Sequence, residues 1–232
     1  MNNSRGFLTG NHLKLVAAFT MLLDHAGILL FPRLQIFRIL GRLAFPLYAF
    51  MIAEGCRYTR NKLRYFLMVF GLGAACQLVY YFVSGDTYLN ILLTFSVSIG
   101  LICLLQRMDR AVEKSLVRSL LWLVGFFAAV AVVWQLNRHL VFDYGFCGIM
   151  APVWASLPLK KGETEKKRIF LLGIGLLCLA LDMGGMQYYS LFSLPILLLY
   201  SGARGKANLK YFFYIFYPAH LAVLQGIAWL VR

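Results

Sequence analysis

Two ionisable residues, Asp24 and His25, stand side by side inside an apolar run of the sequence, LKLVAAFTMLLDHAGILLF. A carboxylate and an imidazole can hold and move a proton near neutral pH, which is the chemistry of general acid–base catalysis. A third ionisable residue, Arg42, lies in the next apolar run, within GRLAFP. A charge at the centre of a membrane helix costs about 2.5–3.5 kcal/mol on insertion scales, so these residues need partners or a function.

The spacing of the first two runs predicts an ion pair between Asp24 and Arg42. A short connection makes the two helices antiparallel neighbours, which brings both residues to a similar depth and would allow both to survive in the membrane. His25 lies about 100° further round its helix and is then free to face a cavity. The alternative is that all three residues form a satisfied buried network that performs no chemistry.

Further polar residues are expected at a depth in the membrane similar to that of Asp24, His25 and Arg42. Asp143 and Tyr144 open another run, in DYGFCGI, and His220 lies one turn from Tyr217 in YIFYPAH. Pro218 frees a backbone carbonyl and can kink its helix. A single intramembrane histidine usually belongs to a satisfied core. Two histidines together with two carboxylates favour a functional centre, in which these residues bind substrate or support the site.

The inner end of the second run, AEGCRYTRNKLR, gives a different signal. Glu54 and Arg57 are three residues apart, and Arg57, Arg60 and Arg64 share one face if the helix continues. Such a basic stripe could bind phosphates through charge-assisted hydrogen bonds. Contact with lipid headgroups is the alternative explanation.

The composition indicates the elements that position these residues. The chain has 232 residues, of which 61% are hydrophobic, and a mean hydropathy of +0.72, far above what a soluble domain needs. Since roughly 20 apolar residues cross a bilayer, we predict an all-α polytopic membrane protein with about nine transmembrane helices and no soluble domain, so that residues 1–232 form a single domain. The expected spans are Leu13–Phe31, Arg38–Cys56, Leu63–Val83, Leu89–Leu105, Val117–Leu136, Val141–Leu157, Arg168–Met183, Tyr188–Tyr200 and Lys210–Leu230. The last two spans before Lys210 are short and joined by Gly184-Gly185, so they are either two tilted helices or one broken element.

The placement of the basic residues explains the net charge of +14. Most of the 23 Lys and Arg fall in alternate linkers, which the positive-inside rule assigns to the cytoplasm. The N-terminus is then cytoplasmic and the C-terminus external, and a nucleic-acid partner is excluded. The five cysteines lack metal-ligand spacing and are expected to pack as small core residues, and no metal site is predicted.

Four motifs together resemble the TraX family in order and spacing: DHAG, GRLAFP, EGCRYTRN and YPAHL. Each motif alone is weak, but the combination is specific and spans most of the chain. The family is named for a conjugative-plasmid protein that N-acetylates pilin. The resemblance therefore implies a membrane acyltransferase that takes acetyl groups from cytosolic acetyl-CoA. Its acceptor would be an amine or hydroxyl at the membrane or its outer face.

The resemblance also implies roles for individual residues. The base would be His25, positioned by Asp24 and Arg42, and the residues expected to bind the acyl donor are Arg57, Arg60, Glu54 and Arg38. The base would deprotonate an acceptor that attacks the thioester directly, with Tyr217, Arg42 or a backbone amide stabilising the oxyanion. An acyl-enzyme formed on His25 or Cys147 is the less favoured route.

The setting that this implies is the inner or plasma membrane of a bacterium. The expected partners are membrane lipids, acetyl-CoA and an acceptor that is either a pilin-like peptide or an envelope glycan, with a homo-oligomer left open. Two other classes of protein remain. A small-molecule transporter or permease would use the buried Asp, His and Arg in a continuous polar path, with no need for acetyl-CoA. A noncatalytic membrane partner would keep its function when His25 is replaced by alanine.

Overall fold

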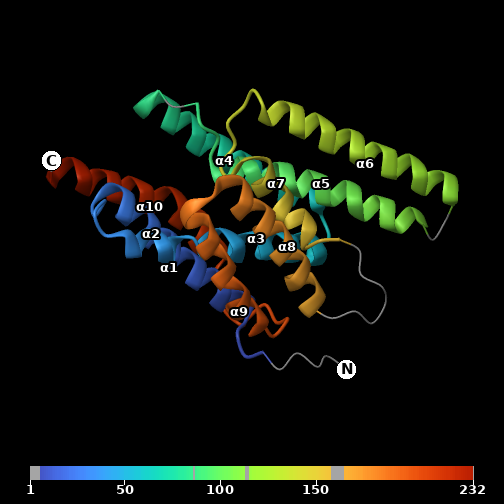
Figure 1. Cartoon of the computed structure of the whole chain (residues 1–232), viewed down its shortest axis with the longest axis horizontal. Coiled ribbons are helices and arrows are strands. Elements are labelled where there is room, and N and C mark those ends of the chain that lie inside the picture. Colours follow the sequence, from blue (N-terminus) through green and yellow to red (C-terminus); the bar gives the residue numbers. More distant parts are fainter. Residues whose placement is uncertain (1–5, 86, 113–114, 158–164, 232) are drawn as a thin grey trace. The chain divides into compact units, whose positions relative to one another are not determined.

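The computed structural model describes residues 6–85, 87–112, 115–157 and 165–231, and the regular elements in these ranges are helices (Figure 1). The all-α class is therefore confirmed. The helices are α1 (Gly10–Leu29), α2 (Gln35–Gly41), α3 (Ala44–Tyr58), α4 (Lys62–Ser84), α5 (Ile91–Val112), α6 (Leu116–Asn137), α7 (Gly145–Trp154), α8 (Glu165–Met183), the 3-10 helix η1 (Gly185–Phe192), α9 (Ser193–Leu198) and α10 (Lys210–Val231). Part of the basic charge used to predict the topology, including Arg5, Lys114, Lys160 and Lys161, lies outside the described residues.

Six helical stretches within these ranges are long and apolar enough to cross a membrane, which makes the chain a multi-pass membrane protein. They are Gly10–Leu29, Gln35–Tyr58, Lys62–Val83, Ile91–Val112, Leu116–Asn137 and Tyr211–Val231. These six candidate spans do not confirm the predicted count of nine transmembrane helices. Helix α7 has ten residues, α8 begins with four charged residues, and the expected eighth span divides into η1 and α9. Gly184 and Gly185, with φ of 66° and 53°, mark the break that the glycine pair indicated.

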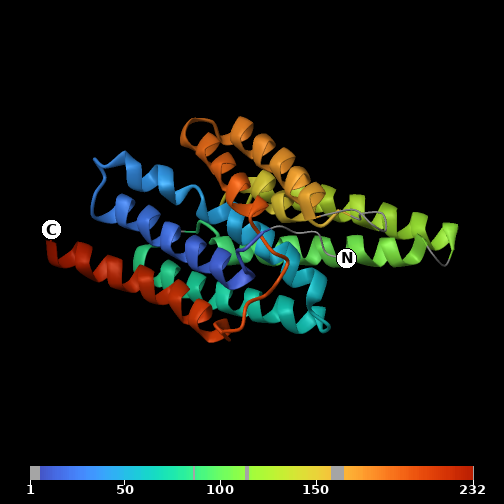
Figure 2. The same ribbon diagram turned by 90° about the horizontal axis from the view of Figure 1, so that it is seen from below.

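The chain divides into two compact units, and the first combines Met1–Met51 with Leu176–Arg232. In it, α1 and α2 form an antiparallel pair. Helix α10 lies beside α1 and runs in the same direction, because Lys14 faces Phe213 near the start of both helices and His25 meets His220 further along (Figure 2). This pairing joins the two ends of the sequence at one buried centre.

The second unit, Ile52–Gly175, is built around α5, which packs against α4, α6 and α7. Serine and threonine on α5 tie it to the chain around α7. Ser98 Oγ donates to the Ile149 carbonyl at 2.7 Å, and Thr94 Oγ1 donates to the Asp143 carbonyl at 3.1 Å. Ile99 and Ile102, on the same helix, are fully buried.

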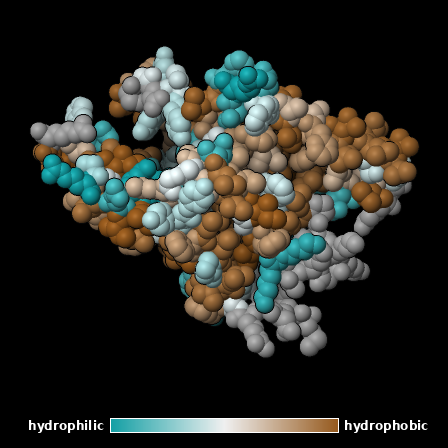
Figure 3. All heavy atoms as spheres, viewed as in Figure 1, coloured by the Kyte–Doolittle hydropathy of each residue, from teal (hydrophilic) through white to brown (hydrophobic). Residues whose placement is uncertain are grey.

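The surface is unusually apolar for a protein of this size. Large hydrophobic side chains are strongly exposed on α4, α6 and α10, for example Phe82, Leu121 and Trp229. Figure 3 shows hydrophobic residues over much of the visible face, with hydrophilic residues gathered in separate patches. Exposed apolar area of this extent requires a covering layer, and lipid provides it for membrane-spanning helices.

Candidate functional site

The first unit holds a buried carboxylate between two guanidinium groups. Arg42 Nη2 donates to both carboxylate oxygens of Asp24, at 2.8 Å to Oδ1 and 2.7 Å to Oδ2. Arg38 Nη1 lies 3.1 Å from Asp24 Oδ2. The predicted Asp24–Arg42 ion pair is therefore confirmed. Arg38, which was predicted to bind the acyl donor, pairs with the same carboxylate. Together the three side chains carry a net charge of +1.

The close approach of α2 to α1 depends on Gly41. A Cβ added at this glycine would lie 2.3 Å from Asp24 Cβ and Oδ1, a distance that real contacts do not allow. The backbone of α2 therefore passes directly against the Asp24 side chain. This contact places Arg38 and Arg42, three residues before and one residue after the glycine, within reach of the carboxylate.

We expect Gly41→Ala to displace the Asp24 side chain and to lower the free energy of unfolding by about 1–3 kcal/mol, as overpacking of a close contact usually does. Gly226→Ala is the matched control, because its added Cβ meets nothing within 4 Å. Thermal unfolding of the purified protein in detergent measures the difference. Equal melting temperatures for the two variants would show that the Gly41 contact is not tight.

Two histidines from opposite ends of the chain meet beside this cluster. His220 Nε2 lies 3.2 Å from His25 Nδ1, and the two rings are arranged edge to face with centroids 5.0 Å apart. Each Nδ1 also contacts a backbone carbonyl one turn earlier in its own helix, Met21 O at 2.9 Å and Phe216 O at 2.8 Å. His220 is buried, whereas His25 is half-buried.

These contacts assign the protons of both rings in the neutral state. A carbonyl oxygen only accepts hydrogen bonds, so Nδ1 carries the proton in His25 and in His220. The His25 Nδ1–H is then shared between Met21 O and the unprotonated Nε2 of His220. It follows that His25 Nε2 has a free lone pair, and no residue in the described part of the chain forms a hydrogen bond with it. This nitrogen is therefore available to accept a proton.

The geometry shows the direct partners of Asp24 and of His25. The family resemblance implied that Asp24 and Arg42 position His25, but the hydrogen bonds of the Asp24 carboxylate run to arginine. The partners of His25 are Met21 and His220. Tyr217, a predicted supporting residue, is buried with its ring 6.0 Å from that of His220. No sequence spacing links residues 195 positions apart, so only the packing of α1 on α10 could reveal the pair.

A further residue of this centre was missed in the sequence. Gln187 on η1 is buried, and its Oε1 accepts a hydrogen bond from Arg42 Nη1 at 3.4 Å. It stands in an uncharged stretch, GMQYYSLF, where nothing marks it as functional. The first unit thus gathers Asp24, Arg38, Arg42 and Gln187 in one connected polar cluster.

The second unit contains another buried ion network. Glu54 and Arg168 form an ion pair, and both are about 95% buried. Arg168 also lies 3.0 Å from Glu165 Oε2 and donates through Nε to the Ala155 carbonyl at 2.9 Å. Arg57 pairs with Glu165 and lies 3.9 Å from Glu54. The two carboxylates and two guanidiniums balance in charge.

This network changes the predicted phosphate-binding stripe. Helix α3 ends at Tyr58 and α4 starts at Lys62, so Arg57, Arg60 and Arg64 do not continue along one helical face. Asn61 begins α4, because its side chain accepts a hydrogen bond from the Arg64 amide. Arg57 is engaged by acidic partners, and Arg60 is exposed in the link between the helices.

Asp143 and Tyr144, the other predicted supporting residues, lie before α7 in the second unit. Tyr88 Oη donates to Asp143 Oδ1 at 2.8 Å. Burial and the neighbouring Asp143 carboxylate raise the pKa of Tyr88, so this phenol remains a donor at neutral pH. Tyr144 has φ of 59°, and among the described residues other than glycine it alone has a positive φ. Such strain often accompanies function.

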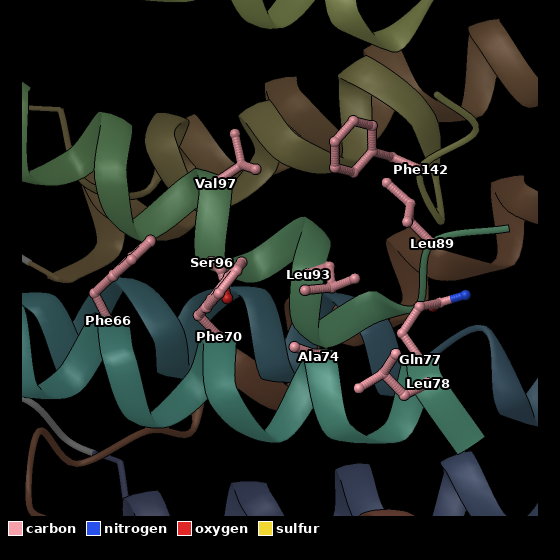
Figure 4. A pocket seen from close by; sticks show the side chains of 10 residues that line it. All are labelled: Phe66, Phe70, Ala74, Gln77, Leu78, Leu89, Leu93, Ser96, Val97 and Phe142. Atoms are coloured by element: carbon pink, nitrogen blue, oxygen red, sulfur yellow. The ribbon is translucent and has the colours of Figure 1, made fainter. Parts of the chain in front are cut away.

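A pocket of about 510 Å³ opens in the second unit, but its chemistry differs from that of the polar clusters (Figure 4). Aromatic and aliphatic side chains such as Phe66, Phe70 and Phe142 line it. Its polar members are already engaged, because Gln77 Oε1 accepts from Asn90 and Ser96 Oγ donates to the Leu92 carbonyl. The pocket therefore lacks the ionisable groups that acid–base chemistry requires.

The fold and these clusters define a polytopic helical membrane protein with a buried carboxylate–guanidinium cluster beside a pair of imidazoles. Within the described ranges, no group of three or more His, Cys, Asp or Glu side chains is arranged to hold a metal ion. The chain belongs to the TraX family, because the family model described as TraX protein matches residues 9–228. The resemblance predicted from the sequence motifs is confirmed.

The chain is also similar to a protein described as a probable fimbrial assembly protein FimC, serogroup H1, from Dichelobacter nodosus. The two are 27% identical over 237 residues, which cover 91% of this chain and 92% of that protein. No solved structure gives a significant match to the chain.

Proposed function

We propose that this protein is a membrane-embedded acetyltransferase, in which His25 is the general base that transfers an acetyl group from acetyl-CoA to an amine or hydroxyl. The observation that carries the proposal is the free Nε2 of His25, on a neutral ring whose Nδ1–H is held by Met21 and His220. A base needs such a lone pair together with a fixed orientation. Membership of the TraX family supports the class of reaction.

The reaction follows from this geometry. His25 Nε2 takes the proton of the acceptor as the acceptor nitrogen or oxygen attacks the thioester carbonyl carbon. The tetrahedral intermediate collapses, the carbon–sulfur bond breaks, and its electron pair leaves with sulfur. The proton on Nε2 then passes to the coenzyme A thiolate. Throughout, the Nδ1–H of His25 stays bonded to Met21 and His220, which stabilises the imidazolium formed in the first step.

The excess positive charge of the first unit's cluster suits this chemistry. The cluster holds two positive charges, on Arg38 and Arg42, and one negative charge, on Asp24. One positive charge is therefore left over, and it lies close to His25, which follows Asp24 in the chain. Positive charge near a reacting carbonyl favours the negative charge that develops there. Of the two arginines predicted to bind the phosphates of the donor, Arg60 is exposed and Arg57 is shared with Glu165.

The acceptor that we propose is a fimbrial or pilin-like subunit in the membrane or at its outer face, with an envelope glycan as the alternative. The basis is the relative from Dichelobacter nodosus, which is described as a probable fimbrial assembly protein. A multi-pass membrane enzyme could reach an acceptor that lies in or against the same membrane. The proposed location is accordingly the bacterial inner membrane.

The parallel packing of α1 and α10 bears on the topology. If both helices cross the membrane in the same direction, the total number of crossings from α1 to α10 is odd. The six candidate spans therefore need an odd number of additional crossings, which α7, α8 and the η1–α9 segment can supply. Nine crossings with a cytoplasmic N-terminus satisfy this condition and agree with the distribution of Lys and Arg.

Inverted membrane vesicles test the proposed function directly. Labelled acetyl-CoA is added to vesicles that contain the protein, and the labelled acceptor is identified by mass spectrometry. We expect label to enter a membrane or fimbrial component and to depend on the protein. Equal labelling in vesicles that lack the protein would contradict the proposal, as would flux of a small molecule in the absence of acetyl transfer.

A further inference from the structure

Gln187 carries a side-chain N–H group with no hydrogen-bond partner in the part of the chain that the structure describes. The side chain is 3% exposed, and its Nε2 has no hydrogen-bond partner among the described residues. Buried amide nitrogens are almost always paired, because an unpaired donor in a dry interior lowers stability. Gln187 Nε2 is one of several such atoms, and a ligand that accepts its hydrogen bond would explain why this donor stands unpaired in the polar cluster.

The orientation of this amide is fixed by its neighbour. Arg42 Nη1 can only donate, so the oxygen of the Gln187 carboxamide must face it, at 3.4 Å. The Nε2 group is therefore the end of the carboxamide that does not face Arg42 Nη1. A second guanidinium nitrogen of this arginine, Nη2, donates to both oxygens of Asp24.

The backbone around Gln187 is also unusual. It lies in η1, a 3-10 helix of eight residues, whereas such helices rarely exceed three or four. Two consecutive left-handed glycines, Gly184 and Gly185, precede it. Long 3-10 segments often mark functional positions, and here the segment delivers a polar side chain into the interior of the first unit.

We propose that Gln187 Nε2 donates to the carbonyl oxygen of the acyl donor and stabilises the oxyanion that forms when the acceptor attacks. The inference rests on the proposed acetyltransferase function and adds a catalytic donor to it. In this role, Gln187 contacts the carbonyl oxygen of the thioester, which gains negative charge in the transition state as the carbonyl bond becomes a single bond. It loses that charge when the carbon–sulfur bond breaks. A neutral amide N–H beside a surplus positive charge is suited to this change.

Gln187→Glu separates this role from a structural one. Glutamate keeps the size of the side chain and an oxygen that can accept from Arg42, but it lacks the N–H donor. In the vesicle assay we expect kcat for acetyl transfer to fall by about 10²–10³-fold, with the KM for acetyl-CoA changed by less than about threefold. Gln135→Glu, at an exposed position near the end of α6, is the matched control and should retain wild-type kcat.

Gln187→Met is a second, uncharged variant that tests the inference if Gln187→Glu does not fold. It is close in shape and introduces no charge, but it removes both the unpaired donor and the oxygen that accepts from Arg42 Nη1. We therefore expect the same loss of kcat, with a lower melting temperature but a protein that remains folded at the assay temperature. Wild-type kcat in either folded variant overturns the inference while leaving the acetyltransferase proposal intact. A loss of activity in Gln187→Met that is matched by an equal loss of folded protein at the assay temperature also overturns it, since that is the mark of a structural residue. Absence of acetyl transfer by the wild type overturns both proposals.

Discussion

His25→Gln is expected to lower the rate of acetyl transfer by about 10²–10⁴-fold, the range usually lost with a general base. Glutamine has a similar length and can still donate to Met21 O, so the packing of α1 on α10 should persist. It cannot accept a proton at neutral pH, so attack on the thioester would proceed without a base. Initial rates of label transfer in inverted vesicles, at equal amounts of protein, measure the effect.

The control for this variant is His139→Gln. His139 is exposed between α6 and α7, and the same substitution there should leave the rate unchanged. If His25→Gln retains more than about a tenth of the wild-type rate, a general-base role for His25 is contradicted. The transporter and the noncatalytic partner would then become the leading explanations for the cluster of Asp24, His25 and Arg42.

Arg168→Met should produce the largest loss of stability, about 3–5 kcal/mol in the free energy of unfolding. The substitution removes the principal partner of Glu54, whose buried carboxylate would remain in an interior that disfavours charge. It also leaves the Ala155 carbonyl without its hydrogen bond from Arg168 Nε. The midpoint of thermal or chemical unfolding in detergent gives the measurement.

Arg57→Met provides a matched comparison in the same network. The Arg57 side chain is 48% exposed, so solvent screens its pairing with Glu165. Its removal should cost no more than about 1 kcal/mol. Replacing Glu54 and Arg168 together by apolar residues should recover much of the stability lost in Arg168→Met, because neither charge is then left alone. Similar losses for Arg57→Met and Arg168→Met would show that burial does not govern this network.

The features predicted correctly from the sequence are those that depend on neighbouring segments. Apolar runs of helical length identify the membrane class, and a short connection brings Asp24 opposite Arg42. The resemblance in motif order identifies the TraX family. In each case the information lies in hydrophobicity, in loop length or in local sequence.

The features that were missed depend on long-range packing. Hydrophobic periodicity shows which helices are buried but not which ones touch, so the contact between His25 and His220 could not be inferred. The same holds for Gln187 beside Arg42 and for Arg168 beside Glu54. The predicted basic stripe failed for a local reason: α3 ends before Arg60, and Asn61 starts a new helix.

Acetyl-CoA binding to the purified, folded protein tests the central claim most directly, because it requires no knowledge of the acceptor. We predict saturable binding by calorimetry in detergent, retained in His25→Gln, since that residue is proposed to act on the acceptor's proton and not to hold the donor. Retained binding together with lost transfer would place His25 in the chemical step. No binding at about millimolar acetyl-CoA, a concentration at which even weak ligands of roughly 4 kcal/mol are detected, would contradict the acetyltransferase proposal.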